Sequence, residues 1–172
     1  MRFSVLTSLM FVGTTLAAPS VALEKRILKN ADQLISKILA MKAGDDVVAV
    51  LKDMSVLSGD SIKITEKMIA DTNNTPGKMS AAAAVQVAEP SGKVATTTVT
   101  IIDDLMLKKD LFVKAKVQKV VLEDLNKLYE VSTRYVAAAK TKIPDQYVAV
   151  ASPYLQKLLD TLKKGIDHFA QY

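Results

Sequence analysis

The stretch TVTIIDDLMLKKDLFVKAKVQKVVLEDLNKLYEVSTRYVAAAKTKIP, residues 98–144, decides the fold of this chain. It reads as the end of one helix, a tight corner and a second, long helix. Past the corner, apolar and small residues recur at three- and four-residue steps, the spacing of one side of an α-helix. These residues are Val117, Val121, Leu125, Leu128, Ser132, Tyr135, Val136 and Ala139. Such a stripe needs partners that cover it, so the stretch predicts further helices packed against it.

The other side of this long helix is charged. Glu123 precedes Lys127 by four residues, and Glu130 precedes Arg134 by four. An acid four residues before a base predicts a weakly stabilising ion pair on the surface of a helix.

Apolar stripes of helical spacing also cover residues 27–42, 47–69, 80–108 and 144–169. Residues 96–100 are rich in β-branched threonine and valine, which favours a strand, but the pattern on both sides has a helical period. We therefore predict helix there as well. The whole chain is expected to be all-α: a four- to five-helix up-and-down bundle around an elongated apolar interior that could hold a cavity.

Glycines and prolines mark the predicted interruptions. Gly44 and residues 73–77 (NNTPG) end the first two helices. Gly59 predicts a bend or a break within the second helix, because glycine weakens helices. Pro90 predicts a break in the third helix, and Pro153 a kink in the last, which could divide it in two. Pro144 marks the start of this last helix.

Composition indicates one globular domain without disulfides. The chain has 172 residues, of which 49% are hydrophobic and 24% charged, and it has no cysteine. The absence of cysteine excludes a disulfide scaffold and thiolate metal sites. The net charge of +5 is spread over polar faces without a long basic block, so no nucleic-acid partner is expected.

The N-terminal residues predict export. Residues 1–18 have the basic start, apolar run and small residues of a signal peptide, and the run is too short for a transmembrane segment. Lys25-Arg26 resembles a dibasic processing site, which would make residues 19–26 a propeptide and residues 27–172 the single domain. The alternatives are a frayed N-terminal helix and two surface charges at the start of the first helix. Extracellular secretion is the prediction.

Asn73-Asn74-Thr75 fits the acceptor pattern for N-glycosylation. The following Pro76 disfavours modification, whereas a secretory route favours it. Asn73 is therefore a candidate glycosylation site.

The sequence offers little for catalysis. His168 is the only histidine, and it lies near the C-terminus where a surface position is expected. Asp103-Asp104 and Glu123-Asp124 are neighbours in predicted helices, so their side chains point about 100° apart and do not form a facing pair. No phosphate-binding glycine loop or nucleophile motif is present. We predict no enzyme activity, no metal and no cofactor.

Binding requires less, namely an apolar space and a few polar groups. The inward stripes carry hydroxyls among aliphatic residues, and an inward hydroxyl could hold a lipid carboxylate. Alternatively, these hydroxyls bond to the backbone four residues before them. The candidate lining residues are Leu51, Met54, Ser58, Ile62, Thr65, Thr98, Ile101, Leu105, Val121, Leu125, Leu128, Ser132, Tyr135, Tyr154, Leu158 and Leu162.

Two segments of the sequence resemble those of a known family. The corner LKKDLF at 107–112 and the segment VLEDL at 121–125, followed by Leu128, are similar to the fungal hydrophobic surface-binding protein A family, also called cell-wall galactomannoproteins. The resemblance extends from about Leu23 to Tyr172. It includes Lys25-Arg26, the Pro90 break, the Ile143-Pro144 junction and the Phe169/Tyr172 ending.

The resemblance implies a secreted, helical protein without enzyme activity. Family members adsorb to hydrophobic surfaces, and some recruit secreted esterases; relatives enclose fatty acids within the bundle and act as antigens. It implies no particular ligand-anchoring residue. The Ser/Thr-rich tail of wall-bound members is missing here, which favours loose association with the cell wall. Two functions follow: a binder of fatty acids or other amphiphiles that also adsorbs to hydrophobic surfaces, or a secreted effector acting through protein contacts.

Overall fold

The computed structural model describes residues 33–42, 47–74, 76–78, 80 and 99–171. Within these residues every regular element is a helix, so the predicted all-α class is confirmed. The elements are helical segments at 33–40 and 99–107, α2 (Val47–Asn74), α4 (Lys109–Lys114), α5 (Gln118–Lys142) and α6 (Asp145–Phe169).

Several predictions from the sequence lie outside the described residues. They are the signal peptide and propeptide, including Lys25 and Arg26, the beginning of the first helix, the stop at Gly44, the break at Pro90, and helix at 96–98. Residues 99–100 are helical, which agrees with the helix predicted for that stretch.

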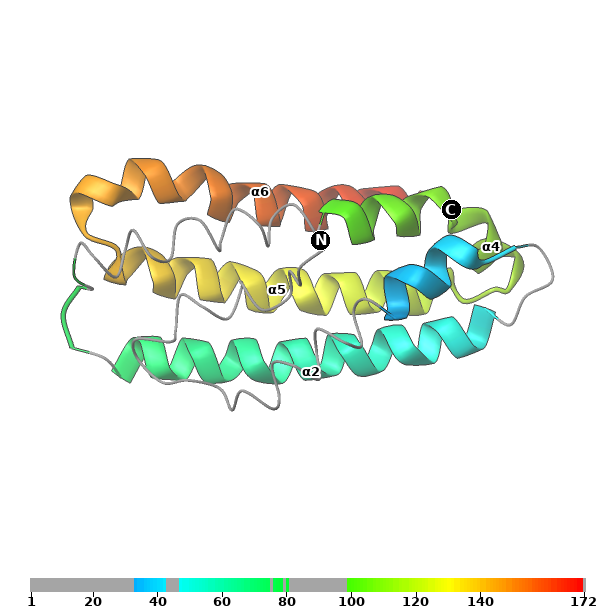
Figure 1. Cartoon of the computed structure of the whole chain (residues 1–172), viewed down its shortest axis with the longest axis horizontal. Coiled ribbons are helices and arrows are strands. Elements are labelled where there is room, and N and C mark those ends of the chain that lie inside the picture. Colours follow the sequence, from blue (N-terminus) through cyan, green and yellow to red (C-terminus); the bar gives the residue numbers. More distant parts are fainter. Residues whose placement is uncertain (1–32, 43–46, 75, 79, 81–98, 172) are drawn as a thin grey trace.

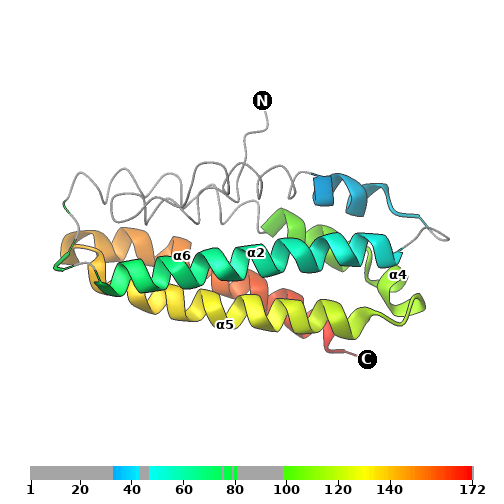
Figure 2. The ribbon, with the colours of Figure 1, turned by 90° about the horizontal axis from the view of Figure 1, so that it is seen from below.

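The three long helices lie side by side along the long axis of the molecule (Figure 1). α5 packs against α2 on one side and α6 on the other, and Figure 2 shows the same helices from a second direction. The helices alternate in direction along the chain: α2 and α5 run one way, and residues 99–107 and α6 run the other way. This is the predicted up-and-down arrangement, in which α2 and α5 are parallel neighbours.

The predicted corner is itself a short helix. α4 follows residues 99–107 after a single turn residue, and the chain then reverses through Lys116, whose φ of 58° is in the left-handed region. Phe112 of α4 is fully buried and meets the Phe169 ring edge-on at 6.1 Å between centroids. The buried Lys109 ammonium donates to the carbonyl of His168 in the last turn of α6. These contacts fix the corner to the C-terminal end of the bundle.

Two predicted breaks are absent from the described helices. α2 continues through Gly59, so a break there is wrong: tertiary packing on both sides outweighs the low helix propensity of one glycine. α6 likewise continues through Pro153 as one helix, so it is not divided in two, and the kink at Pro153 stays a prediction. α6 begins at Asp145 with Pro144 as its cap, so the predicted start near Pro144 is confirmed. The stop after α2 is confirmed, with Gly77 at a φ of +72°.

Two polar contacts set the register between α2 and α5. The Ser55 hydroxyl donates to the Asp124 carboxylate at 2.7 Å, and the Arg134 guanidinium donates to both oxygens of Glu66 at 2.7 and 2.6 Å. The sequence separations are 69 and 68, as parallel helices require. Arg134 thus forms its ion pair with the neighbouring helix rather than with Glu130, the partner that the four-residue spacing predicted.

The core is one long cluster with a smaller one beside it. The large cluster includes residues of every described helical segment, whereas Val136, Ile143, Leu155 and Leu159 form the smaller one where α5 turns into α6. Gly165 allows a close approach, because a Cβ built on it would lie 2.9 Å from a methyl of Ile102.

The two helical glycines predict opposite responses to substitution. Around Gly59 there is open space, so Gly59→Ala should raise the free energy of unfolding by about 0.5–1 kcal/mol through helix propensity. Gly165→Leu should lower it by about 1–3 kcal/mol, because the new side chain meets Ile102 and Leu125. Urea denaturation followed by circular dichroism measures both. A loss of stability in Gly59→Ala would contradict an unbroken α2.

Candidate ligand-binding cavity

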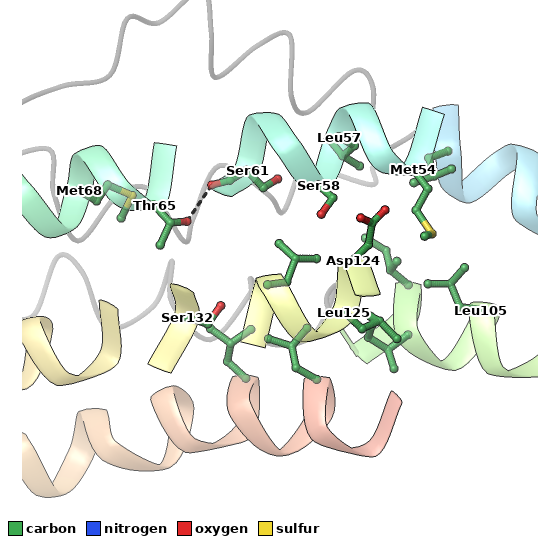
Figure 3. Close-up of a pocket in the computed structure, with 16 residues that line it drawn as sticks. Met54, Leu57, Ser58, Ser61, Thr65, Met68, Leu105, Asp124, Leu125 and Ser132 are labelled. Atoms are coloured by element: carbon green, nitrogen blue, oxygen red, sulfur yellow. Dashed lines mark hydrogen bonds between the residues drawn. The ribbon is translucent and has the colours of Figure 1, made fainter. Parts of the chain in front are cut away.

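A cavity of about 120 Å³ lies inside the bundle, between α2, α5, α6 and the segments at 33–40 and 99–107. Its wall is mostly aliphatic (Figure 3). The lining residues are Leu34, Met54, Leu57, Ser58, Ser61, Thr65, Met68, Ile101, Ile102, Leu105, Asp124, Leu125, Leu128, Ser132, Leu158 and Leu162.

The shape of the cavity follows from helix geometry. On α2 the lining positions Met54, Ser58, Ser61, Thr65 and Met68 are spaced by four and three residues, so they form one stripe. From Met54 to Met68 the helix rises about 21 Å. A single acyl tail spans about 15 Å, half of the ~30 Å hydrocarbon core of a bilayer. The lined column is therefore long enough for an acyl tail.

Most of the residues predicted to line a ligand site meet at this wall. They are Met54, Ser58, Thr65, Ile101, Leu105, Leu125, Leu128, Ser132, Leu158 and Leu162. Others lie elsewhere: Leu51, Val121 and Tyr135 are buried in the core beside the cavity, and Ile62 is half-buried. Thr98 is outside the described residues.

Tyr154 is a correction to the predicted stripe of α6. Its side chain is 41% exposed, whereas Leu155, Leu158 and Leu162 are buried. One residue turns a helix by about 100°, so Tyr154 falls beyond the edge of the face that Leu155 occupies.

Sequence reasoning did not select six of the lining residues, which are Leu34, Leu57, Ser61, Met68, Ile102 and Asp124. Five of them belong to the apolar stripes of the sequence. Which residues of a stripe face the cavity depends on how each helix is rotated about its axis, and the sequence does not give this rotation. Asp124 is different, because a carboxylate next to Glu123 predicts a solvent-exposed position. A small signal was present: Asp124 lies one residue before Leu125 and three after Val121, at the edge of the buried stripe of α5.

The hydroxyls of the wall differ in their bonds. The Thr65 hydroxyl donates to the carbonyl of Ser61 at 2.9 Å, which is the alternative that the sequence left open. The Ser58 hydroxyl is buried without a hydrogen-bond partner. Asp124 is 9% exposed and accepts the bond from Ser55 described above. Figure 3 shows the side chains of Ser58 and Asp124 pointing from their helices into the space between them.

The adjacent carboxylates Asp103 and Asp104 have different surroundings. Asp103 makes an ion pair with Lys164 at 2.8 Å, whereas one oxygen of the neighbouring Asp104 is buried without a partner. Burial, and next the charge of Asp103, raise the pKa of Asp104 above its ordinary value. In the described part of the chain, no three acidic or histidine side chains gather as they would to hold a metal.

Two curated relatives align with nearly the whole chain. Cell wall mannoprotein 1 of Aspergillus fumigatus is 27% identical over 177 residues, which cover 98% of this chain, and its namesake in Aspergillus flavus gives the same identity and coverage. The resemblance to the cell-wall galactomannoproteins is confirmed. The chain spans 60% and 63% of the length of these two relatives. No protein-family model matches it.

Solved structures have the same fold. Ligand-binding domain 1 of the MP1 protein of Penicillium marneffei, in complex with arachidonic acids, superposes with a TM-score of 0.71 at 22% identity over 88% of this chain and 99% of that domain. AFMP4P in complex with palmitic acid gives a TM-score of 0.74 at 19% identity over 92% of this chain and 99% of that one. At such identities the likeness establishes the fold.

Tyr135 provides a test of the core beside the cavity. Its ring is buried and its hydroxyl has no hydrogen-bond partner, which is a desolvation cost without compensation. We expect Tyr135→Phe to raise the free energy of unfolding at neutral pH by about 1 kcal/mol. A loss of more than about 1 kcal/mol in urea denaturation would show that the hydroxyl makes a stabilising bond.

Burial of Tyr135 also leads us to expect that the protein is less stable at alkaline pH. Burial raises the pKa of Tyr135 above its ordinary value of 10.0, so the folded protein keeps the proton after the unfolded chain has lost it. Stability from this group is complete below pH 10 and falls as the pH rises further. Part of the alkaline loss should therefore disappear in Tyr135→Phe and remain in Tyr154→Phe, whose ring is exposed. Denaturation curves above and below pH 10 measure it, and equal losses in both variants would contradict it.

Proposed function

We propose that the protein is a secreted, non-enzymatic binder of fatty acids or similar amphiphiles, and that the alkyl chain occupies the cavity of the bundle. The observation that carries this proposal is a mostly aliphatic cavity of about 120 Å³ between the helices, whose lining residues on α2 extend over a helix rise of about 21 Å. The fatty-acid complexes of the two structural neighbours support it, because the same fold holds such ligands there.

Removal of methylenes from water supplies the driving force. Each buried methylene contributes about 0.8 kcal/mol, so a tail with about ten buried methylenes gains roughly 8 kcal/mol before the costs of ordering. That gain is on the scale of a micromolar complex. An ionised head group at the end of the tail would lose this gain if it were buried unpaired, so it needs water or a donor.

The cavity must widen to take a full tail. Its 120 Å³ is comparable with an engineered cavity of about 150 Å³ that binds benzene, and smaller than the ~300–1,000 Å³ of most ligand sites. Met54 and Met68 stand at the two ends of the α2 stripe, and methionine side chains adapt to irregular spaces. We propose that these side chains rearrange as the tail enters between α2 and α5.

Secretion and association with the cell wall are part of the proposal. The N-terminal signal pattern and the cell-wall relatives support export. None of the helices in the described residues is both long and apolar enough to cross a membrane. Asn73 is exposed in the last turn of α2, where a glycan would fit without disturbing the core. The intact mass of secreted protein would reveal the mature start and any glycan.

Filling the cavity should abolish binding without unfolding the bundle. Leu128 and Leu122 are both half-buried on α5, but only Leu128 belongs to the cavity wall. We expect Leu128→Trp to weaken the binding of a fluorescent palmitate analogue by about tenfold or more, a change of at least 1.4 kcal/mol. Leu122→Trp should bind within about threefold of the unmodified protein.

Fluorescence titration measures both affinities, and circular dichroism checks that both variants are helical. The proposed function is refuted if the unmodified, folded protein does not bind the analogue. The cavity is the wrong site if the two tryptophan variants bind equally well.

A second proposal is adsorption to hydrophobic surfaces. Large apolar side chains are exposed on several described helices, namely Leu39, Val48, Val56, Leu107, Val120, Val150 and Tyr154. Partial opening of the bundle would add its buried stripes to these contacts. We also propose that an adsorbed molecule could recruit secreted esterases.

The surface proposal predicts retention on hydrophobic beads. The protein should stay on octyl-coated beads through washes that release a soluble helical bundle of similar size. Glutaraldehyde cross-linking of the folded protein should reduce retention, because the buried stripes can then no longer open. Equal retention of the protein and the unrelated bundle would contradict the proposal.

A further inference from the structure

We propose that the part of the cavity around Ser58 and Asp124, one helical turn from Met54, selects amphiphiles with a neutral, hydroxyl-bearing head group over fatty acids with an ionised carboxylate. This inference rests on the proposed function and names the class of ligand that this chain prefers. It begins from Asp124, a carboxylate in the wall of an otherwise apolar cavity.

Asp124 is incompletely satisfied by the protein. A buried carboxylate can accept several hydrogen bonds, and it is costly to bury one without a cation or several donors. Ser55 gives it one bond at 2.7 Å. Across the described helices, no lysine or arginine forms an ion pair with it, and no other donor reaches it. Part of its capacity to accept is therefore available to a ligand in the cavity.

Ser58 is an independent sign of a polar ligand group. Its side chain is 5% exposed, lines the same cavity and has no partner for its hydroxyl. It lies on the same face of α2 as Ser55, one turn further along, and points toward the space that Asp124 enters from α5 (Figure 3). Leaving a hydroxyl buried without a bond costs free energy, which a ligand that bonds to it would recover.

The two groups together favour an alcohol. A ligand hydroxyl can donate to the carboxylate of Asp124 and accept from the hydroxyl of Ser58 at the same time. An ionised fatty-acid head group has no proton to donate, and it would face the negative charge of Asp124 in a poorly solvated space. The position suits a head group, because from Ser58 to Met68 the α2 wall extends about 15 Å, the length of one acyl tail.

The position of this polar site makes both orientations of a bound fatty acid electrostatically unfavourable. A fatty acid could reverse and point its carboxylate toward the Met68 end, but its methyl end would then cover Asp124 and remove water from it. Both orientations of the acid thus carry an electrostatic cost that the alcohol avoids. The carboxylate of Asp124 therefore acts as a specificity determinant.

Two ligands of equal chain length test this inference. Dodecan-1-ol and dodecanoate differ only at the head group, and each can displace a fluorescent lipid from the purified protein at neutral pH. We expect the alcohol to bind about tenfold more tightly or better, because like charges near each other disfavour the ionised acid. Dodecanoate binding as tightly as the alcohol, or more tightly, would overturn the proposal.

The matched variants are Asp124→Asn and Glu123→Gln. Both remove one negative charge from neighbouring positions of α5, but Glu123 is exposed and outside the cavity wall. We expect Asp124→Asn to improve dodecanoate binding by about tenfold or more and to reduce the preference for the alcohol, since the charge repulsion is gone. Glu123→Gln should leave both affinities unchanged. Equal effects of the two variants would overturn the proposal.

Ser58→Ala provides a test that does not alter charge. Loss of the hydroxyl should weaken dodecan-1-ol by about twofold to tenfold, the scale of one hydrogen bond, and leave dodecanoate unchanged. This variant decides the question if Asp124→Asn does not fold. If the unmodified protein does not bind the fluorescent lipid at all, the proposed function fails and this inference with it. If both bind and the variants do not change their ratio, only this inference fails.

Discussion

The structure depends on the burial of α5 between two other long helices. Both flanks of α5 carry buried residues, from Val121 near its start to Ala139 near its end, and α2 and α6 cover them. α5 in turn covers part of the apolar stripe of each neighbour. The connections between the helices are short, so successive helices run in alternating directions. Everything that the bundle encloses, including the cavity, is positioned by this shared interior.

The cavity arises where small polar residues replace large apolar ones on facing helices. Ser58, Ser61 and Thr65 of α2 stand opposite Leu128 and Ser132 of α5, in a region where the rest of the interior is leucine, methionine and isoleucine. A serine fills much less space than a leucine, so the wall recedes without a change in the path of the backbone. The same residues place hydroxyls in an apolar space. The same small hydroxyl-bearing residues thus create both the void and its polar groups, which makes the site suitable for an amphiphile.

The register between α2 and α5 decides which polar side chains line the cavity wall. Ser55 with Asp124 and Glu66 with Arg134 hold the two helices at a constant offset over about ten residues. The Arg134–Glu66 pair is exposed and bidentate, so it specifies alignment more than it contributes stability. The bond from Ser55 orients Asp124 toward α2 and so brings a carboxylate to the cavity. A shift of one turn would bring other residues of α2 to Asp124.

The sequence alone determined the class of fold, the positions of the long helices and most of the buried faces, because a 3.6-residue period is a local property of the chain. It also identified the stop after α2 and the corner before α5, where glycine, proline and the end of a stripe leave local signals. Only the tertiary structure decided that α2 continues through Gly59, that Arg134 pairs with Glu66, and that Tyr154 faces outward. It also decided that Asp124 enters the cavity. Each of these depends on the rotation and offset of one helix against another, and contacts between residues far apart in the chain set both.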